Sequence, residues 1–410
     1  MCITLINSSL YSNENMDSLV SVNSSKTKFF KLTAKEKFER IKIPLVKKES
    51  KKVFWLLPAI AWNNYDKTQI GLLLGADLDS VFSIKAIPMY GTGSKNLTGV
   101  FNSTFYIAPK RKFATSISLN AKRFSYLLFP EDLTYNKIAP EISVLVYKND
   151  KATIHANFKH ISIWQEYLYN GRKTTYSFLN ELSVKHQCKR EYLQLKNSLS
   201  FKSGKQFGIL QLENKTQYNY KKLKSNSLYA GFLLGGFLYN TKAGNNIEAP
   251  APLLLLSGTS NFGIHWLQKD YGFNQYYFDR NAEDNFFRRQ SNTSDGGFKS
   301  ITSAGNANKF MFALNLKSDV GIPYKVKRFL NVQPYSNIAF SKNGNLKGAF
   351  YAEAGVSLLF LDEVIGFHFP FATTKNIQNN QATILGTQKG DWAKKISFSF
   401  DLMRLRDKLK

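Results

Sequence analysis

Five histidines are the side chains of this sequence best suited to bind a metal ion or to carry a proton near neutral pH. They are His155, His160, His186, His265 and His368. The first two lie five positions apart, in a stretch that alternates between polar and apolar residues. Because successive side chains of a strand point to opposite faces, an odd separation puts the two imidazoles on opposite faces. We therefore expect no metal site here.

A second set of reactive groups combines two arginines with an acidic, glycine-containing motif. Arg288 and Arg289 precede Asp295, Gly296 and Gly297. A guanidinium can make two parallel hydrogen bonds to a carboxylate, so these residues could form a charged cluster that closes a loop against the inside of the protein. The alternative is an exposed loop that happens to carry charges. The sequence leaves both interpretations open.

Lysines form the third set, and four of them lie at polar positions between apolar ones: Lys122, Lys196, Lys215 and Lys317. A buried ammonium group without a partner is costly, so these positions suit a wet interior better than a dry core. Together with the formal net charge of +27, they would favour anions in a channel. The alternative is a composition rich in lysine and asparagine, with no binding role for the charge.

Motifs of common enzyme classes are missing from the sequence. It has no Gly-x-Ser-x-Gly, no P-loop, no dinucleotide-binding glycine motif before a helix and no Cys-x-x-Cys, and its two cysteines are Cys2 and Cys188. Asp362 and Glu363 are adjacent, so a strand would point them to opposite faces, and a solvated turn is the better interpretation. We expect no enzymatic activity and no cofactor.

The elements that must position these residues are strands. In Lys395 to Leu402 every second residue is apolar, which predicts one apolar and one polar face. Similar segments recur from about residue 52 onward, with turn signals between them and no helical crossover. They amount to about 14 to 16 strands. The predicted fold is all-β: an antiparallel transmembrane β-barrel, closed into a cylinder with its apolar side toward lipid.

The chain divides into a lead-in and a barrel. Residues 1–50 are rich in Ser, Asn and Lys and predict a polar linker, whereas residues 51–406 predict the barrel. Residues 241–307 interrupt the alternation and predict long loops, which is where barrels usually carry function. The first residues lack the basic start and apolar core of a signal peptide, and we expect an export signal upstream of the sequence given.

Several short motifs occur in a fixed order along residues 50–405. The first group is Trp55, Pro58, Asn63, Tyr65 and Asp66, and the second is Ile87, Pro88, Tyr90, Gly93, Ser94 and Lys95. With the segments 287–299 and 308–323, they resemble the C-terminal β-barrel region that follows the peptidase module in large gluzincin-type (aminopeptidase-like) membrane proteins. A gluzincin holds zinc with His-Glu-x-x-His, which this chain lacks, so the resemblance implies a barrel without its peptidase. More remotely, the Asp-Gly-Gly-Phe motif at 295–298 is similar to surface-antigen barrels of the BamA type, which implies 16 strands.

Three functional hypotheses follow. The first is a non-enzymatic barrel in the outer membrane of a Gram-negative bacterium, acting as a membrane anchor or as a subunit of a complex. Its partners would be the lipid bilayer and periplasmic or surface proteins, with no nucleic acid. The second is an outer-membrane pore or transporter for anionic, peptide or lipid cargo. The third is a soluble basic β-protein that binds polyanions, which polar residues at the inward positions of many strands oppose.

Overall fold

The computed structural model of the chain describes most of residues 52–401, and the statements below concern this part alone. The described ranges are 52–78, 81–110, 113–127, 132–149, 152–168, 171–220, 226–241, 253–257, 272–274, 278, 286–291, 295–327, 329–344, 347–386 and 391–401. The predicted lead-in at 1–50 and His265 lie outside these residues.

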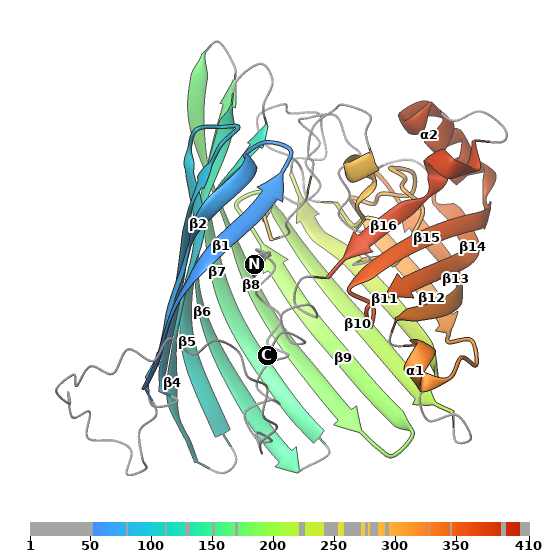
Figure 1. The fold of residues 1–410 in the computed structure, drawn as a ribbon. Coiled ribbons are helices and arrows are strands. Elements are labelled where there is room, and N and C mark those ends of the chain that lie inside the picture. Colours follow the sequence, from blue (N-terminus) through green and yellow to red (C-terminus); the bar gives the residue numbers. More distant parts are fainter. Residues whose placement is uncertain are drawn as a thin grey trace.

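Sixteen antiparallel strands form one sheet, in which each strand is hydrogen-bonded to its neighbours in the sequence. The first eight are β1 (Lys52–Asn63), β2 (Lys67–Leu78), β3 (Phe82–Gly91), β4 (Leu97–Lys110), β5 (Phe113–Leu127), β6 (Leu133–Asn149), β7 (Ala152–Leu168) and β8 (Arg172–Lys189). The second eight are β9 (Leu193–Ser203), β10 (Phe207–Asn219), β11 (Ser227–Asn240), β12 (Phe310–Ser318), β13 (Leu330–Lys342), β14 (Ala349–Phe360), β15 (Ile365–Thr373) and β16 (Ser397–Phe400). Figure 1 shows the sheet curled into a barrel wall whose two edges are β1 and β16. The predicted all-β antiparallel fold is confirmed, at the upper end of the expected strand number.

Four short helices accompany the sheet: η2 (Phe286–Arg289), α1 (Tyr324–Lys327), α2 (Lys375–Leu385) and η3 (Trp392–Lys395). The sequence did not predict α2, which lies between β15 and β16. Its buried residues Ile377, Gln381 and Leu385 are spaced by four and form one stripe, and Gly386 ends the helix with a φ of 58°. None of the helices in the described ranges is both long and apolar enough to cross a membrane.

The two faces of the wall differ in the way that the alternation predicts, and β13 illustrates this. Its inward side chains, Asn331, Gln333 and Asn337 among them, are buried, whereas Ile338 and Phe340 point outward and are exposed. Other strands also present large exposed apolar side chains on their outer face. A soluble protein rarely exposes so much contiguous apolar surface.

The inner face carries a row of alternating charges across four neighbouring strands, which we name the charge ladder. Glu141 lies opposite Lys159, Lys159 opposite Glu181, and Glu181 opposite Lys202. Lys159 Nζ is 3.2 Å from Glu141 Oε2, and the two side chains are 8% and 1% exposed. The ladder therefore pairs charges in the interior of the wall.

The wall differs from the predicted closed cylinder at the seam between its first and last strands. Within the described residues, β1 and β16 are not hydrogen-bonded to each other. The predicted strand 395–402 is reduced to the four residues of β16, because η3 occupies the positions just before it. Phe278 bridges the two edges, since its carbonyl accepts from the Asn64 N–H at 2.6 Å and its ring lies 5.5 Å from that of Phe400.

Candidate functional site: the occupied interior of the barrel

Two parts of the β11–β12 connection fold against each other inside the wall. We call residues 253–257 and 295–308 together the inner segment. Leu254 and Ala307 exchange two backbone hydrogen bonds of 2.8 Å. Both residues, and Phe298, are at most 1% exposed and belong to the same apolar cluster as wall residues. The interior of the barrel is therefore not polar throughout, because the loops bury their own apolar side chains in it.

Glu353 on β14 is the main polar contact between the wall and the inner segment. Its carboxylate accepts hydrogen bonds from the backbone N–H groups of Lys299 at 2.5 Å and Ser300 at 2.9 Å. Asn337 Nδ2 donates to the same carboxylate at 2.7 Å, and Glu353 is only 2% exposed. One buried carboxylate thus fixes a loop and a neighbouring strand together.

The sequence motif Asp295-Gly296-Gly297 lies at the start of the second part of the inner segment. Asp295 accepts from the Leu255 N–H at 3.3 Å and from Gln211 Nε2 on β10 at 3.4 Å. Burial raises the pKa of the Asp295 carboxyl from 3.8 to about 6. Gly297 has a φ of 76°, and a Cβ there would lie 2.5 Å from the Asn315 side chain, so only glycine fits without a shift.

The side chain of Arg289 is not brought to this motif. Arg289 Nη1 donates to the Ala393 carbonyl at 3.0 Å, beside the seam, where Gln290 and Ser291 pair with Phe398 of β16. The side chain of Arg288 lies outside the described residues. The structure thus places Arg289 at the seam and Asp295 in the inner segment, each with its own partners.

Lys299 is a titratable group of the inner segment and is not among the four lysines that the sequence indicates. Burial lowers the pKa of its ammonium group from 10.5 to about 7, and the nearby charge of Lys317 adds to the effect. The carboxylates of Glu353 and Glu363 act in the opposite direction but do not compensate. The docked loop therefore carries a lysine whose charge changes near neutral pH.

A second contact between loop and wall lies at β5 and β6, where Lys122 and Lys137 are direct register partners on the inner face. Lys137 Nζ donates to the Gly272 carbonyl at 2.7 Å, and Lys122 Nζ donates to the Asn274 carbonyl at 3.5 Å. Phe273, between Gly272 and Asn274 in the chain, stacks its ring on that of Tyr135, with 3.9 Å between the ring centres. Both lysines are buried, and carbonyl groups of the loop accept from them.

The other three predicted lysines lie on the inner faces of β9, β10 and β12. Lys196 and Lys215 are direct register partners, and Lys215 Nζ is 3.6 Å from a carboxylate oxygen of Glu213. Lys317 Nζ lies 4.5 Å from the centre of the Tyr229 ring. Two like charges side by side give this part of the wall a positive character.

Helix α2 holds the inner segment from its other side through Asn380. The Asn380 Oδ1 atom accepts from Thr302 Oγ1 and from the Ser303 N–H, each at 2.8 Å. Ile301 of the segment also packs against Leu385 of the helix. The residues around Asn380 gave no sign of this role in the sequence.

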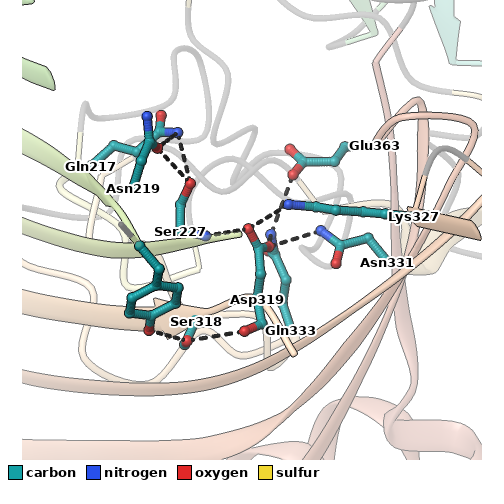
Figure 2. A network of polar contacts seen from close by, with 10 residues as sticks. Gln217, Asn219, Ser227, Ser318, Asp319, Lys327, Asn331, Gln333 and Glu363 are labelled. Atoms are coloured by element: carbon teal, nitrogen blue, oxygen red, sulfur yellow. Dashed lines mark hydrogen bonds and ion pairs between the residues drawn. The ribbon is translucent and has the colours of Figure 1, made fainter. Parts of the chain in front are cut away.

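A polar cluster around Asp319 joins several elements at the end of the barrel where α1 lies (Figure 2). Asp319 Oδ2 accepts from the Ser227 N–H at 2.8 Å and forms an ion pair with Lys327 at 2.7 Å. Its Oδ1 accepts from Asn331 at 2.9 Å and Gln333 at 2.7 Å. Burial alone would raise the pKa of Asp319, but these hydrogen bonds outweigh burial and lower it.

The motif residues of the first two hairpins meet in a hydrogen-bonded contact at the opposite end. Asp66 is fully buried and accepts from Asn63 Nδ2 at 3.0 Å and from Ser94 Oγ at 2.6 Å. Gly93 N–H also donates to the Asp66 carbonyl at 2.9 Å. These residues of the ordered sequence motifs therefore join two neighbouring turns by hydrogen bonds.

The described histidines do not gather. His155 points inward and is 9% exposed, while His160 on the other face of β7 contacts Asn180 Oδ1 at 2.7 Å. His368 lies between the hydroxyls of Ser357 and Ser399. The prediction that His155 and His160 lie on opposite faces is confirmed.

Comparisons with known proteins concern the path of the chain only. No protein-family model and no curated protein matches this sequence. Among solved structures, BamA from Haemophilus ducreyi lacking POTRA domains 1–3 has a TM-score of 0.44 and 9% identity, covering 80% of this chain and 68% of that chain. CdiB from Acinetobacter baumannii has a TM-score of 0.39 at 7% identity, covering 80% and 63%. The siderophore receptor PirA from Pseudomonas aeruginosa has a TM-score of 0.33 at 11% identity, covering 78% and 64%.

These likenesses are similarities of chain path at low identity, and they transfer no residue role to this chain. The resemblance to the barrel region of gluzincin-type proteins stays a prediction.

Proposed function

We propose that this chain is a non-enzymatic β-barrel of the Gram-negative outer membrane, with loops of its own held against the inside of the wall, which anchors or accompanies other proteins. The observation that carries the proposal is the docking of the inner segment on the buried carboxylate of Glu353, which accepts two hydrogen bonds from the segment and a third from Asn337 of the wall. A barrel whose wall binds a loop inside it is suited to keeping a constant shape rather than to letting solutes pass freely.

The outer face supports a place in the membrane. Large apolar side chains such as Leu56, Ile70 and Leu316 point outward and are 64%, 58% and 53% exposed. Outer-membrane barrels present such an apolar band to lipid and keep their polar side chains inside. The same exposure opposes the soluble polyanion-binding alternative.

The orientation follows from the lengths of the connections. The β11–β12 connection and the α2-containing β15–β16 connection lie at the same end, whereas most turns at the other end are short. Outer-membrane barrels have short periplasmic turns and longer extracellular loops. We therefore assign the inner segment and α2 to the extracellular end, and α1 with the Asp319 cluster to the periplasmic end.

The second candidate function is an anion-selective pore. It is favoured by the adjacent inward lysines Lys196 and Lys215 and by Lys317. In this alternative the inner segment would leave the interior during transport.

Conductance across a planar lipid bilayer separates the two functions. We expect the purified, reconstituted protein to give no steady channels, because the inner segment is held inside the wall by its contacts with Glu353. Glu353→Gln should give intermittent openings. Steady anion-selective channels of the unmodified protein would refute the anchor proposal in favour of the pore.

A further inference from the structure

The outward face of β11 has the residues expected of a strand in contact with lipid, and the other strands can be compared with it. Its outward positions are apolar without interruption from Leu228 to Leu238. Leu228 and Leu234 are each 39% exposed, and Leu238 is 65% exposed. About 9 to 11 residues of a tilted strand cross the hydrocarbon layer, so this face matches its thickness.

The outward face of β8 differs from that of β11. Leu182 and Val184 are exposed and apolar, but Asn180 precedes them and His186 follows them on the same face. Tyr176 and Phe178 also lie on this face, before Asn180, so two polar side chains interrupt the apolar face of β8, whereas that of β11 has no interruption. Polar side chains facing hydrocarbon are expensive unless they have partners.

The polar outward residues continue across the neighbouring strands in register. On β8–β10, Asn214 Nδ2 donates to Asn197 Oδ1 at 2.6 Å, and Asn197 Nδ2 lies 3.5 Å from His186 Nδ1. On β7 and β8, His160 contacts Asn180 at 2.7 Å and Ser162 at 3.1 Å. We call these polar outward residues the polar strip. It has two parts, which are His160, Ser162 and Asn180 on β7 and β8, and His186, Asn197 and Asn214 on β8, β9 and β10.

Apolar side chains lie on both sides of the strip, so it is not simply the edge of the membrane band. On β9, Leu195 precedes Asn197 and Leu199 follows it on the same face, and Leu199 is 48% exposed. On β10, Leu212 precedes Asn214 on this face, and Thr216, which donates to Asn214 Oδ1 at 2.9 Å, lies between Asn214 and Tyr218. The polar groups therefore lie inside the band where lipid chains would otherwise be.

We propose that the outward face of β7–β10 is covered in the membrane by a second copy of this chain. A carboxamide has two N–H donors and an acceptor oxygen, so Asn197 and Asn214 of one copy can pair with the same residues of another across a two-fold axis. Acyl chains offer no hydrogen bonds, and lipid headgroups lie outside the band. The inference goes beyond the anchor role and depends only on the barrel being in a membrane.

The area of the face is sufficient for such a contact. Four strands about 4.8 Å apart and a band about 25 Å tall give roughly 480 Å² of flat area for each copy. Two copies then bury about 1,000 Å², which reaches the lower limit for a specific protein interface.

Cys188 provides a native reporter, because it is a free thiol on the outward face of β8, two positions after His186. In the variant Cys2→Ser it is the single cysteine, and a short bis-maleimide added to membranes should join two copies through it. The matched control places a single cysteine on the apolar face, with Leu234→Cys combined with Cys2→Ser and Cys188→Ser. We expect a covalent dimer from Cys188 and none from the control.

The polar pairing is tested by Asn197→Leu combined with Asn214→Leu in the Cys2→Ser background. The dimer yield should fall about tenfold, which corresponds to about 1.4 kcal/mol, while heat-modifiable gel mobility reports that the barrel is folded. Equal cross-linking of Cys188 and the Leu234→Cys control would overturn the proposal, as would a cross-linked product with the mass of another protein. An unchanged yield in the folded leucine variant would also overturn it. Because the Cys188 comparison leaves the asparagines intact, it decides the matter even if the leucine variant does not fold.

Discussion

Replacing Glu353 with glutamine should release the inner segment from the barrel wall. The carboxylate accepts from two backbone N–H groups, of Lys299 and Ser300, and from the side chain of Asn337. Glutamine keeps one acceptor oxygen but turns an NH₂ group toward one or more of these donors. The substitution therefore removes hydrogen bonds without changing the size of the side chain.

The size of the effect follows from the contacts at Glu353. Hydrogen bonds to charged groups contribute about 1.5–3 kcal/mol each, and glutamine loses one or two of the three. Relief from burying a charge offsets part of this loss. We expect the free energy that holds residues 295–308 in place to fall by about 2–4 kcal/mol, which corresponds to roughly 30- to 1,000-fold in the opening equilibrium.

Hydrogen exchange of the protein in lipid nanodiscs measures this equilibrium directly. The amides of residues 295–308 should exchange faster by that factor, whereas strands such as β7 should be unchanged. Glu213→Gln is the matched control, since Glu213 is an inward carboxylate 33% exposed that pairs with a Lys215 side chain 72% exposed, and such pairs contribute at most about 1 kcal/mol. If residues 295–308 keep their protection in Glu353→Gln, the wall does not hold the inner segment through this carboxylate.

Three further predictions concern the same parts of the molecule. Docking of the inner segment should be weakest between pH 6 and 7. The pKa of Asp295 is raised from 3.8 to about 6, which favours docking at lower pH, and the pKa of Lys299 is lowered from 10.5 to about 7, which favours docking at higher pH. Limited proteolysis that is fastest outside the range of pH 6 to 7 would contradict this. Gly305→Ala should destabilise the segment by about 1–3 kcal/mol, because the residue has a φ of 72° and a Cβ would lie 2.2 Å from Leu256 Cδ1; unchanged hydrogen exchange would count against the packing described. Asp319→Asn should lower the free energy of unfolding in urea by about 1.5–3 kcal/mol, because it removes the ion pair with the mostly buried Lys327 and weakens hydrogen bonds to a charged acceptor. A loss below 1 kcal/mol would show that the cluster is not stabilising.

The sequence is sufficient to predict the wall, because alternation is a local signal that each strand repeats. The outward Ile338 and Phe340 and the inward Asn337 of β13 follow from period two alone. The opposite faces of His155 and His160 follow from the same rule. Helix α2 was missed because Lys375 to Leu385 is rich in Asn and Gln and has no strong apolar stripe, so its stability comes from contacts such as that of Asn380 with the inner segment.

The interior contacts could not be predicted, because they join residues far apart in the chain. Arg289 and Asp295 are close in sequence, yet one contacts Ala393 near β16 and the other contacts Gln211 on β10. Glu353 lies at an inward position of a regular strand, and nothing in its neighbours indicates that loop amides will reach it. Period two gives the side of the wall on which a charge lies, but its partner depends on the fold of the loops.

The charge ladder has a consequence for how the barrel is assembled. If β6 slipped past β7 by two residues, the same apolar side chains would still meet lipid, so the membrane cannot reject the error. Inside, however, Glu141 would then face Asn157 or Ile161 in place of Lys159, and the ion pair between Glu141 and Lys159 would be lost from the charge ladder. The correct register of these long strands is therefore favoured by ion pairs on the inner face, because registers that differ by two residues present the same apolar side chains to the bilayer.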